Sequence, residues 1–333
     1  MTILSHSDIE PMRRGRWTRW AIVGLLCVAA LVFLPMVVYP LLLMKIMCFA
    51  LFAAAFNLLF GFTGLLSFGH AAFFGVAIYG VAYSLKMWGI GPATALVFGV
   101  AVAALLGLVI GGLAIRRQGV YFAMITLALS QLVYFIILQA PFAQGEDGLQ
   151  GVPRGTLFGL VDLSEPTYLY AVIAVLFLGG LAFVWRVVNS PFGRIIRAIK
   201  ENEARAMSMG YDIARYKLTM FVLSAGLSGL AGGMKVLVFQ FATLHDVTWQ
   251  MSGEPVLMSL IGGIGTLAGP VVGAVVVVVL QNYLATSPLP VTLVTGVIFI
   301  LCVLLFRRGI VGEIGRIPAL RRLWESSDKG GEK

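Results

Sequence analysis

The chain has 333 residues, of which 59% are hydrophobic and only 12% are charged, with a formal net charge of +9. A soluble domain carries about 25% charged residues, so this composition excludes an ordinary soluble protein and indicates a polytopic membrane protein. Its apolar runs are long and continuous rather than alternating, which favours membrane helices over a closed barrel and predicts an all-α fold. The three cysteines, Cys27, Cys48 and Cys302, lie in apolar runs without motif spacing, so we expect neither a disulfide framework nor a metal site.

Apolar segments of membrane-spanning length follow one another along nearly the whole chain. The first follows Arg13, Arg14, Arg16 and Arg19, and we interpret it as an uncleaved span rather than a signal peptide. The penultimate segment is too long for one span and contains "GGIGTLAGP" (Gly262 to Pro270), which predicts two short helices there. About 8–10 transmembrane segments are therefore expected. The apolar segments lie at 20–43, 46–62, 71–88, 93–115, 120–138, 168–188, 218–240, 254–285 and 290–306.

The basic residues set the expected orientation, because Lys and Arg collect in cytoplasmic loops. With both termini cytoplasmic, only Lys45, Lys86, Arg154 and Lys235 of the 24 Lys and Arg residues fall outside. The positive charge thus reflects topology, and we expect no nucleic-acid partner. The predicted parts are a cytoplasmic segment (1–19), a transmembrane permease domain (20–306) with a periplasmic loop (139–167) and a cytoplasmic loop (189–217), and a cytoplasmic tail (307–333).

Two Gly-rich interruptions stand in the apolar runs, one in each half of the chain. The first lies in "NLLFGFTGLLSFGHAAFFGVAIYG" (Asn57 to Gly80), and the second is Gly262 to Pro270. Broken helices in corresponding halves point to a transport site, since irregular backbone at membrane depth survives only against protein or a water-filled cavity. The expected pathway residues are Gly61, Gly64, Ser67, Gly69, His70, Gly262, Gly263, Gly265 and Pro270. The alternative is that these glycines only allow close helix packing.

At the first interruption, the helix expected to resume at Ala71 would present free amides to a substrate carboxylate. Outside the interruptions, Gln131, Gln139, Gln281 and Asn282 are lone polar residues in apolar runs, where interhelical hydrogen bonds are the expected role.

The cytoplasmic loop "NSPFGRIIRAIKENEARAMSMGYDIARYKL" predicts a short amphipathic helix over 191–210. Ser190 and Pro191 predict a helix start, and Gly210 predicts its end. The apolar face is expected to include Ile196, Ile199 and Met207, whereas the polar face carries pairs at i,i+4 spacing. Those pairs are Arg197–Glu201 and Glu201–Arg205. The segment is either an interfacial connector or a docking helix for a cytoplasmic partner.

The chain resembles the LivM family of inner-membrane permease subunits of bacterial branched-chain amino acid ABC importers. The resemblance rests on "GFTGLLSFGHAAFFGVAIY", "GVYFAMITLALSQ", "GEDGLQGVPRG", the cytoplasmic loop and "MSLIGGIGTLAGPVVGA", which occur in family order over most of 46–306. It implies that the loop is the segment that seats in the ATPase, with Arg197, Glu201, Glu203, Ala204, Arg205 and Gly210 as coupling residues. At Ala143-Gln144 the chain departs from the expected Thr-Gly-like pair, which leaves the ligand class open.

The resemblance also implies a heterodimer with a LivH-type permease, two cytoplasmic ATPase subunits, a periplasmic binding protein and a place in the bacterial inner membrane. ATP would be bound by the partners and no cofactor by this chain, in which no Gly-Lys dipeptide of a phosphate-binding loop occurs. Permeases for amides, aromatic acids or sugars remain alternatives. "GFTGLLSFGH" lacks the carboxylate that sugar permeases carry at this break, which argues against sugars.

Two further functions are possible alternatives. An intramembrane serine protease would use "GLSG" (Gly226 to Gly229) with His70 or His245 as base. The small residues of "SAGLSGLAGG" (Ser224 to Gly233) repeat at helical spacing, however, so packing is the expected role and no catalytic residue is predicted. An ion-coupled secondary transporter usually needs ionisable residues inside the membrane. Lys86, Lys235 and Glu254 instead lie near the outer ends of spans, where snorkelling is expected.

Overall fold

A computed structural model describes residues 33–36, 38–157, 159, 161–285, 294, 296, 297, 300 and 309–314. The chain separates into two units, residues 1–43 and 44–333. The described part of the first unit contains a 3₁₀ helix, Leu34–Met36, and the start of helix α2 (Pro40–Thr63). The predicted spans 20–43 and 290–306 lie largely outside the described residues.

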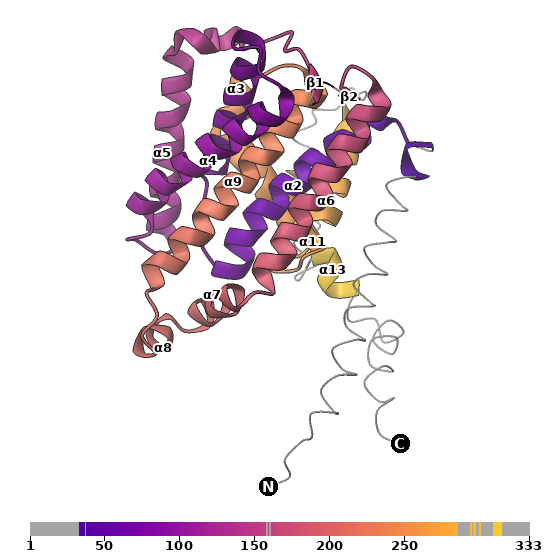
Figure 1. The fold of residues 1–333 in the computed structure, drawn as a ribbon. Coiled ribbons are helices and arrows are strands. Elements are labelled where there is room, and N and C mark those ends of the chain that lie inside the picture. Colours follow the sequence, from indigo (N-terminus) through magenta and orange to yellow (C-terminus); the bar gives the residue numbers. More distant parts are fainter. Residues whose placement is uncertain are drawn as a thin grey trace, which may run out of the picture. The chain divides into compact units, whose positions relative to one another are not determined.

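The second unit is built from helices, which confirms the all-α prediction (Figure 1). Five described helices are long and apolar enough to cross a membrane. The segment at 254–285 is divided into two short helices, as its internal glycines predicted. Besides α2, the longer helices are α3 (His70–Met87), α4 (Pro92–Ala114), α5 (Val120–Gln139), α6 (Pro166–Val188), α9 (Ile213–Phe239), α10 (Trp249–Gly262) and α11 (Gly269–Leu284).

Small residues allow α3, α4 and α9 to pack closely. A Cβ at Gly229 of α9 would lie 2.5 Å from the Cβ of Ala103, and one at Gly111 of α4 would lie 2.8 Å from a ring carbon of Phe221. A Cβ at Gly232 would collide with the backbone carbonyl of Phe74. Membrane helices gain little from hydrophobic burial against each other, so close van der Waals contact between small residues stabilises their association. The packing role predicted for "SAGLSGLAGG" is therefore confirmed.

Both Gly-rich segments interrupt helices where predicted. Helix α2 ends at Thr63, and Gly64 follows with φ +76° before α3 begins at His70. Helix α10 ends at Gly262, and Gly263 and Gly265 have φ of +123° and +76°. These are conformations that only glycine adopts without strain, which explains why the chain breaks at these points.

The predicted cytoplasmic helix over 191–210 is two helices rather than one. They are α7 (Pro191–Glu201) and α8 (Glu203–Ser208), and Asn202 between them has φ −155° and ψ 99°. The Asn202 side chain accepts a hydrogen bond from the backbone N–H of Arg205 at 2.9 Å and so caps α8. The prediction failed because an asparagine offers the backbone a competing partner and starts a new helix.

The loop between α5 and α6 lies at the end of the unit opposite α7 and α8 (Figure 1). It contains a two-residue antiparallel pair, β1 (Thr156–Leu157) and β2 (Val161–Asp162). Arg154 donates to the carbonyls of Leu237 at 3.0 Å and Val238 at 2.9 Å, and so binds the last turn of α9. Partial burial lowers the pKa of Arg154 from its ordinary value. The loop is thus fixed to the C-terminal end of α9.

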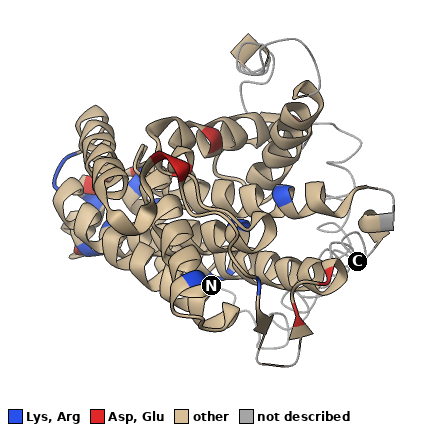
Figure 2. Cartoon of the chain, turned by 90° about the horizontal axis from the view of Figure 1, so that it is seen from above, with Lys and Arg blue, Asp and Glu red and all other residues tan. Residues whose placement is uncertain are grey.

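Charged residues are few on the described helices, and most of the ribbon carries none (Figure 2). Lys235 of α9 was expected to reach water by snorkelling, but its side chain is 11% exposed and forms an ion pair with Asp246. Asp246 belongs to the 3₁₀ helix η5 (Leu244–Val247), which packs against α3. A buried lysine needs a paired partner, and the sequence did not show that Asp246 would fold back onto α9.

Candidate functional site

The two Gly-rich breaks meet through one buried side chain, Asn57 of α2, which is 2% exposed. Its Oδ1 accepts a hydrogen bond from the Gly265 N–H at 2.9 Å, and its Nδ2 donates to the Thr266 carbonyl at 2.8 Å. One turn further along α2, a Cβ at Gly61 would lie 2.8 Å from the nitrogen of Gly265. The breaks are therefore joined backbone to backbone, and Gly61 is a glycine because the second break occupies the space of its side chain.

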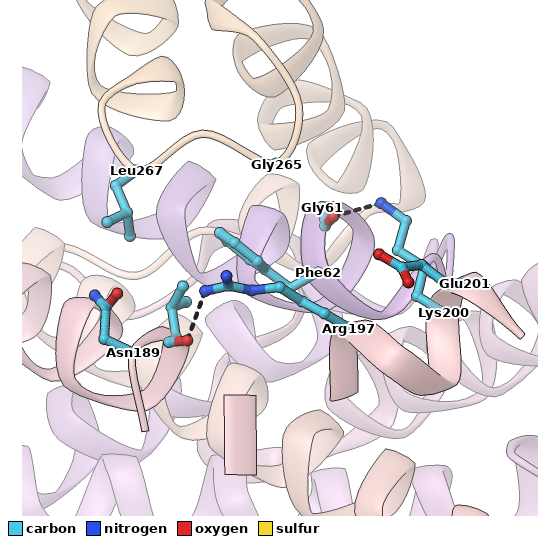
Figure 3. Close-up of a pocket in the computed structure, with 9 residues that line it drawn as sticks. Gly61, Phe62, Asn189, Arg197, Lys200, Glu201, Gly265 and Leu267 are labelled. Atoms are coloured by element: carbon cyan, nitrogen blue, oxygen red, sulfur yellow. Dashed lines mark hydrogen bonds between the residues drawn. The ribbon is translucent and has the colours of Figure 1, made fainter. Parts of the chain in front are cut away.

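Helix α7 contacts the same place from the opposite side. Lys200 donates to the carbonyl oxygen of Gly61 at 2.7 Å (Figure 3). Arg197 donates to the carbonyl of Val188 at 2.7 Å, and its guanidinium carbon lies 5.6 Å from the ring centroid of Phe62. That distance suits a cation–π contact. A displacement of α7 would consequently act directly on the end of α2.

These groups surround a cavity of about 520 Å³ at the end of the unit that carries α7 (Figure 3). Gly61 and Phe62 lie on the α2 side, with Gly265 and Leu267 contributed by the second break. Arg197, Lys200 and Glu201 bring two positive charges and one negative charge from α7. The predicted residues Gly61, Gly265, Arg197 and Glu201 thus come together, whereas Asn57 and Lys200 were not among those predicted. A polar residue before a Gly-rich break was the available signal for Asn57.

Among the residues predicted to couple to an ATPase, one on α8 is anchored and the others are exposed. Glu203 accepts from Lys217 at 2.8 Å and from Gln118 at 2.9 Å, which holds α8 against its neighbours. The exposed positions are Ala204, Arg205 and Gly210, together with Met207 (63% exposed) and Met209 (58% exposed).

The predicted polar pairing along this segment is wrong. Within the described residues, neither Arg197–Glu201 nor Glu201–Arg205 forms an ion pair. Arg197 instead binds the Val188 carbonyl and lies over Phe62, and the bend at Asn202 separates Glu201 of α7 from Arg205 of α8. Met207 was expected on the buried face and lies on the exposed one. An apolar and basic surface consisting of Arg205, Met207 and Met209 remains.

The second half of the first break is buried among the helices. The His70 side chain is fully buried, and its Nε2 lies 2.9 Å from Ser224 Oγ. Ser224 donates its own proton to the carbonyl of Ala55 at 2.6 Å, so Nε2 is the donor to Ser224. Ser67 Oγ accepts from the Gly69 N–H at 3.1 Å. The hydrogen bonds from His70 to Ser224 and from Ser224 to Ala55 therefore connect α3, α9 and α2.

The start of α3 offers no free amide at Ala71, contrary to expectation. The Ala71 N–H donates to Ser252 Oγ at 2.9 Å, and Ser252 donates in turn to the Phe68 carbonyl at 2.7 Å. Gly64 is exposed beside Lys200. Pro270 lies in the first turn of α11, where its missing N–H is not needed.

The serine of "GLSG" is not arranged for hydrolysis. Ser228 Oγ donates to the Ser224 carbonyl at 3.0 Å within α9. His70 contacts Ser224 rather than Ser228, and the Ser224 proton is already donated to Ala55. A nucleophilic serine must donate its proton to the base, whereas here the His70 ring donates to the serine that it contacts. Among the residues that the structure describes, no three His, Cys, Asp or Glu side chains are grouped to hold a metal ion.

A family model described as "Branched-chain amino acid transport system / permease component" matches residues 39–306. The chain is 27% identical over 257 residues to the high-affinity branched-chain amino acid permease protein LivM of Salmonella typhimurium, covering 70% of this chain and 60% of that one. It is 27% identical over 286 residues to LivH of the same organism, covering 80% and 91%, and 25% identical over 232 residues to the fructose import permease protein FrcC of Rhizobium meliloti, covering 65% and 63%.

The chain thus spans about 60% of the length of the LivM relative that it matches. No solved structure matches it. The family match covers most of the helices, both breaks and the segment of α7 and α8. The chain belongs to the family of permease components of branched-chain amino acid transport systems.

Proposed function

We propose that this chain is a permease subunit of an ATP-binding cassette importer that moves branched-chain or related amino acids across the bacterial inner membrane. The observation that carries the proposal is the linkage of the exposed α7–α8 segment to both breaks through Lys200, Gly61 and Asn57. Family membership and the similarity to LivM and LivH support the substrate class. A separate ATPase supplies the energy, and this chain has no ATPase site of its own.

The partners are a LivH-type permease, two cytoplasmic ATPase subunits and a periplasmic substrate-binding protein. The ATPase is expected to contact α8 at Arg205, Met207 and Met209, because an exposed apolar patch beside a basic residue is typical of a docking surface. When the ATPase moves α7, Lys200 moves the carbonyl of Gly61, and the two breaks that line the substrate pathway shift together.

The direct test reconstitutes the chain with these partners in proteoliposomes and measures uptake of radioactive L-leucine, with ATP inside or outside. We expect uptake that requires ATP on the face carrying α8 and that requires the binding protein. Fructose is the comparison substrate. Uptake of fructose without leucine, or leucine uptake that needs no ATP, would overturn the proposal.

The coupling role of α8 is tested with Arg205→Glu. If Arg205 forms a buried charge pair with the ATPase, reversing its charge is expected to cost about 2–5 kcal/mol of binding free energy. Assembly or ATP-driven uptake should then be abolished, while insertion into the membrane stays normal. Arg117→Glu is the control, because Arg117 is also an exposed arginine outside the membrane helices. Normal uptake by Arg205→Glu would reduce the segment to a connector.

The orientation is part of the proposal, with both termini cytoplasmic and 140–167 periplasmic. In a background without cysteines, Gly155→Cys is expected to react with an impermeant maleimide in intact spheroplasts. Ser327→Cys is expected to react only after lysis. Labelling of Ser327→Cys before lysis would reverse the assignment.

A further inference from the structure

A second cavity lies between α2, α9, α10 and α11, close to η5 and to the end of α9 that Arg154 contacts. Its volume is about 330 Å³. On α2 it is lined by Lys45 near the start of the helix, whereas Gly61 and the first cavity lie near the end of the same helix. The two cavities are thus at opposite ends of the bundle.

One side of this cavity is apolar and aromatic, and the other is charged. Phe49, Phe239 and Phe241 supply three rings. Lys45 and Lys235 supply two ammonium groups, Asp246 and Glu254 supply two carboxylates, and exposed His245 lies beside them. Charges of both signs beside an apolar wall are unusual in a membrane helix bundle, where ionisable residues are costly and commonly functional.

Two of these charges already satisfy each other. Lys235 forms an ion pair with Asp246 and lies 5.7 Å from the ring centroid of Phe241. The second oxygen of Asp246 accepts from the Thr243 N–H at 3.3 Å and the Thr243 hydroxyl at 3.0 Å. This pair holds η5 onto α9 and forms one wall of the cavity. Its two charges neutralise each other, so we do not assign them to a ligand.

The other two charges are not paired. Within the part of the chain that the structure describes, Lys45 has no hydrogen bond and no ion pair, although it is only partly exposed. Glu254 accepts two hydrogen bonds from the Gln281 side-chain amide, at 2.9 and 3.0 Å, and forms no ion pair with a described residue. The amide fixes the direction of the carboxylate without neutralising it. Lys45 and Glu254 act on each other electrostatically across the cavity but form no direct ion pair, so a cation and an anion face a ligand from two sides.

We propose that this cavity is a transient binding site for a zwitterionic α-amino acid on its way through the permease. The carboxylate of the ligand pairs with Lys45, its ammonium group pairs with Glu254, and its apolar side chain packs against the three phenylalanine rings. The assignment rests on the proposed function and adds the substrate chemistry that the permease itself selects.

The size and charge of the cavity suit this ligand class better than its rivals. Small-molecule sites occupy roughly 300–1,000 Å³, so 330 Å³ suits a small solute. A sugar would leave both charges unpaired, and a simple acid or amine would leave one of them unpaired. A buried charge that a ligand leaves unpaired weakens the binding of that ligand. Lys45 and Glu254 therefore both attract a zwitterion and disfavour sugars, acids and amines.

The test uses a diazirine analogue of L-leucine that cross-links on illumination, applied to the complete importer in proteoliposomes. In the wild-type complex we expect cross-links on peptides that contain residues 45–49 or 235–254, removed by excess L-leucine. Isocaproate, which lacks the ammonium group, and isoamylamine, which lacks the carboxylate, are expected not to compete at the concentration at which leucine does.

Lys45→Met and Glu254→Gln are each expected to lower leucine-sensitive cross-linking and leucine uptake by about tenfold, because each removes one charged contact in a partly buried site. Lys86→Met and Glu165→Gln are the matched controls, since both residues lie at the same end of the bundle outside the cavity, and both should behave as wild type. Lys45→Arg keeps the positive charge and is expected to retain most of the cross-linking.

Three results separate the possible failures. A wild-type complex that takes up no amino acid refutes the proposed function itself. A complex that takes up leucine but shows no leucine-sensitive cross-link in these peptides refutes this site alone. If Lys45→Met does not assemble, the competition experiment in the wild-type complex still tests the proposal. Isocaproate or isoamylamine that competes with the cross-linker as well as L-leucine does would overturn zwitterion recognition.

Discussion

Adding a single methyl group at Gly61 tests whether the two breaks are truly in backbone contact. In Gly61→Ala the new Cβ would lie 2.8 Å from the nitrogen and 2.9 Å from the Cα of Gly265. The Asn57 side-chain oxygen, which itself binds the Gly265 N–H, lies nearer still, so Asn57 and the second break must both move. Overpacking of this kind costs about 1–3 kcal/mol. Moving Gly265 also lengthens its 2.9 Å hydrogen bond to Asn57, which adds about 0.5–1.5 kcal/mol.

Helix propensity works in the opposite direction, since alanine is about 1 kcal/mol better than glycine within a helix. Gly112 of α4 separates the two effects. It stands two residues before the last residue of its helix, as Gly61 does in α2, and a Cβ there would meet nothing within 4 Å. Gly112→Ala is therefore expected to keep or raise the free energy of unfolding. The free energy of unfolding of Gly61→Ala should be lower than that of Gly112→Ala by about 2–4 kcal/mol.

The measurement is the thermal midpoint of the two variants in the purified complex, together with ATP-driven leucine uptake. We expect a Tm for Gly61→Ala that is lower than that of Gly112→Ala by ~5 °C or more. Uptake should be reduced in Gly61→Ala only, because the linkage from α7 to the second break passes through this contact. An equal or higher Tm for Gly61→Ala would show that the breaks are not packed against each other, and would refute the reasoning.

Three further predictions concern the groups around these sites. Asn57→Ala leaves the N–H of Gly265 and the carbonyl next to it without their partner, so we expect a loss of about 1–3 kcal/mol, measured as a lower Tm of the complex. Lys200→Met removes the donor to Gly61, so ATP hydrolysis should continue while leucine uptake per ATP falls, and unchanged uptake per ATP would contradict the coupling role. Lys235→Met leaves Asp246 buried without its partner and should destabilise by about 3–5 kcal/mol, whereas adding Asp246→Leu to that variant should recover part of the loss.

The helices and their interruptions were predictable because both depend on local properties. A run of apolar residues long enough to cross a bilayer must satisfy its backbone internally, which leaves the helix as the solution for 93–115 or 120–138. The split of 254–285 followed from glycines and a proline within one run. The start of α7 was equally local, since Ser190 accepts from the Gly193 N–H as an N-cap does.

Contacts between distant segments were not predictable from the pattern. Asn57 and Gly265 are separated by 208 residues, and a polar side chain in an apolar run shows that a partner exists but not which one. His70 contacts Ser224 on another helix, 154 residues away, and the sequence did not indicate this partner. Gln281 was correctly expected to form an interhelical hydrogen bond, but its partner Glu254 emerged only from the fold. The pattern therefore predicted which groups needed partners, and tertiary packing decided the pairs.

The placement of the two cavities bears on how such a subunit can work. The first cavity contains the linkage from α7 to both breaks, whereas the second contains the unpaired Lys45 and Glu254 at the other end of α2. Helix α2 and helix α10 each contribute to the second cavity and each end in one of the breaks. Closely packed segments shift between discrete arrangements rather than deforming smoothly. We therefore propose that a movement of α7 that displaces Gly61 relative to Gly265 also changes the distance between Lys45 on α2 and Glu254 on α10, and with it the affinity for a zwitterion held between them.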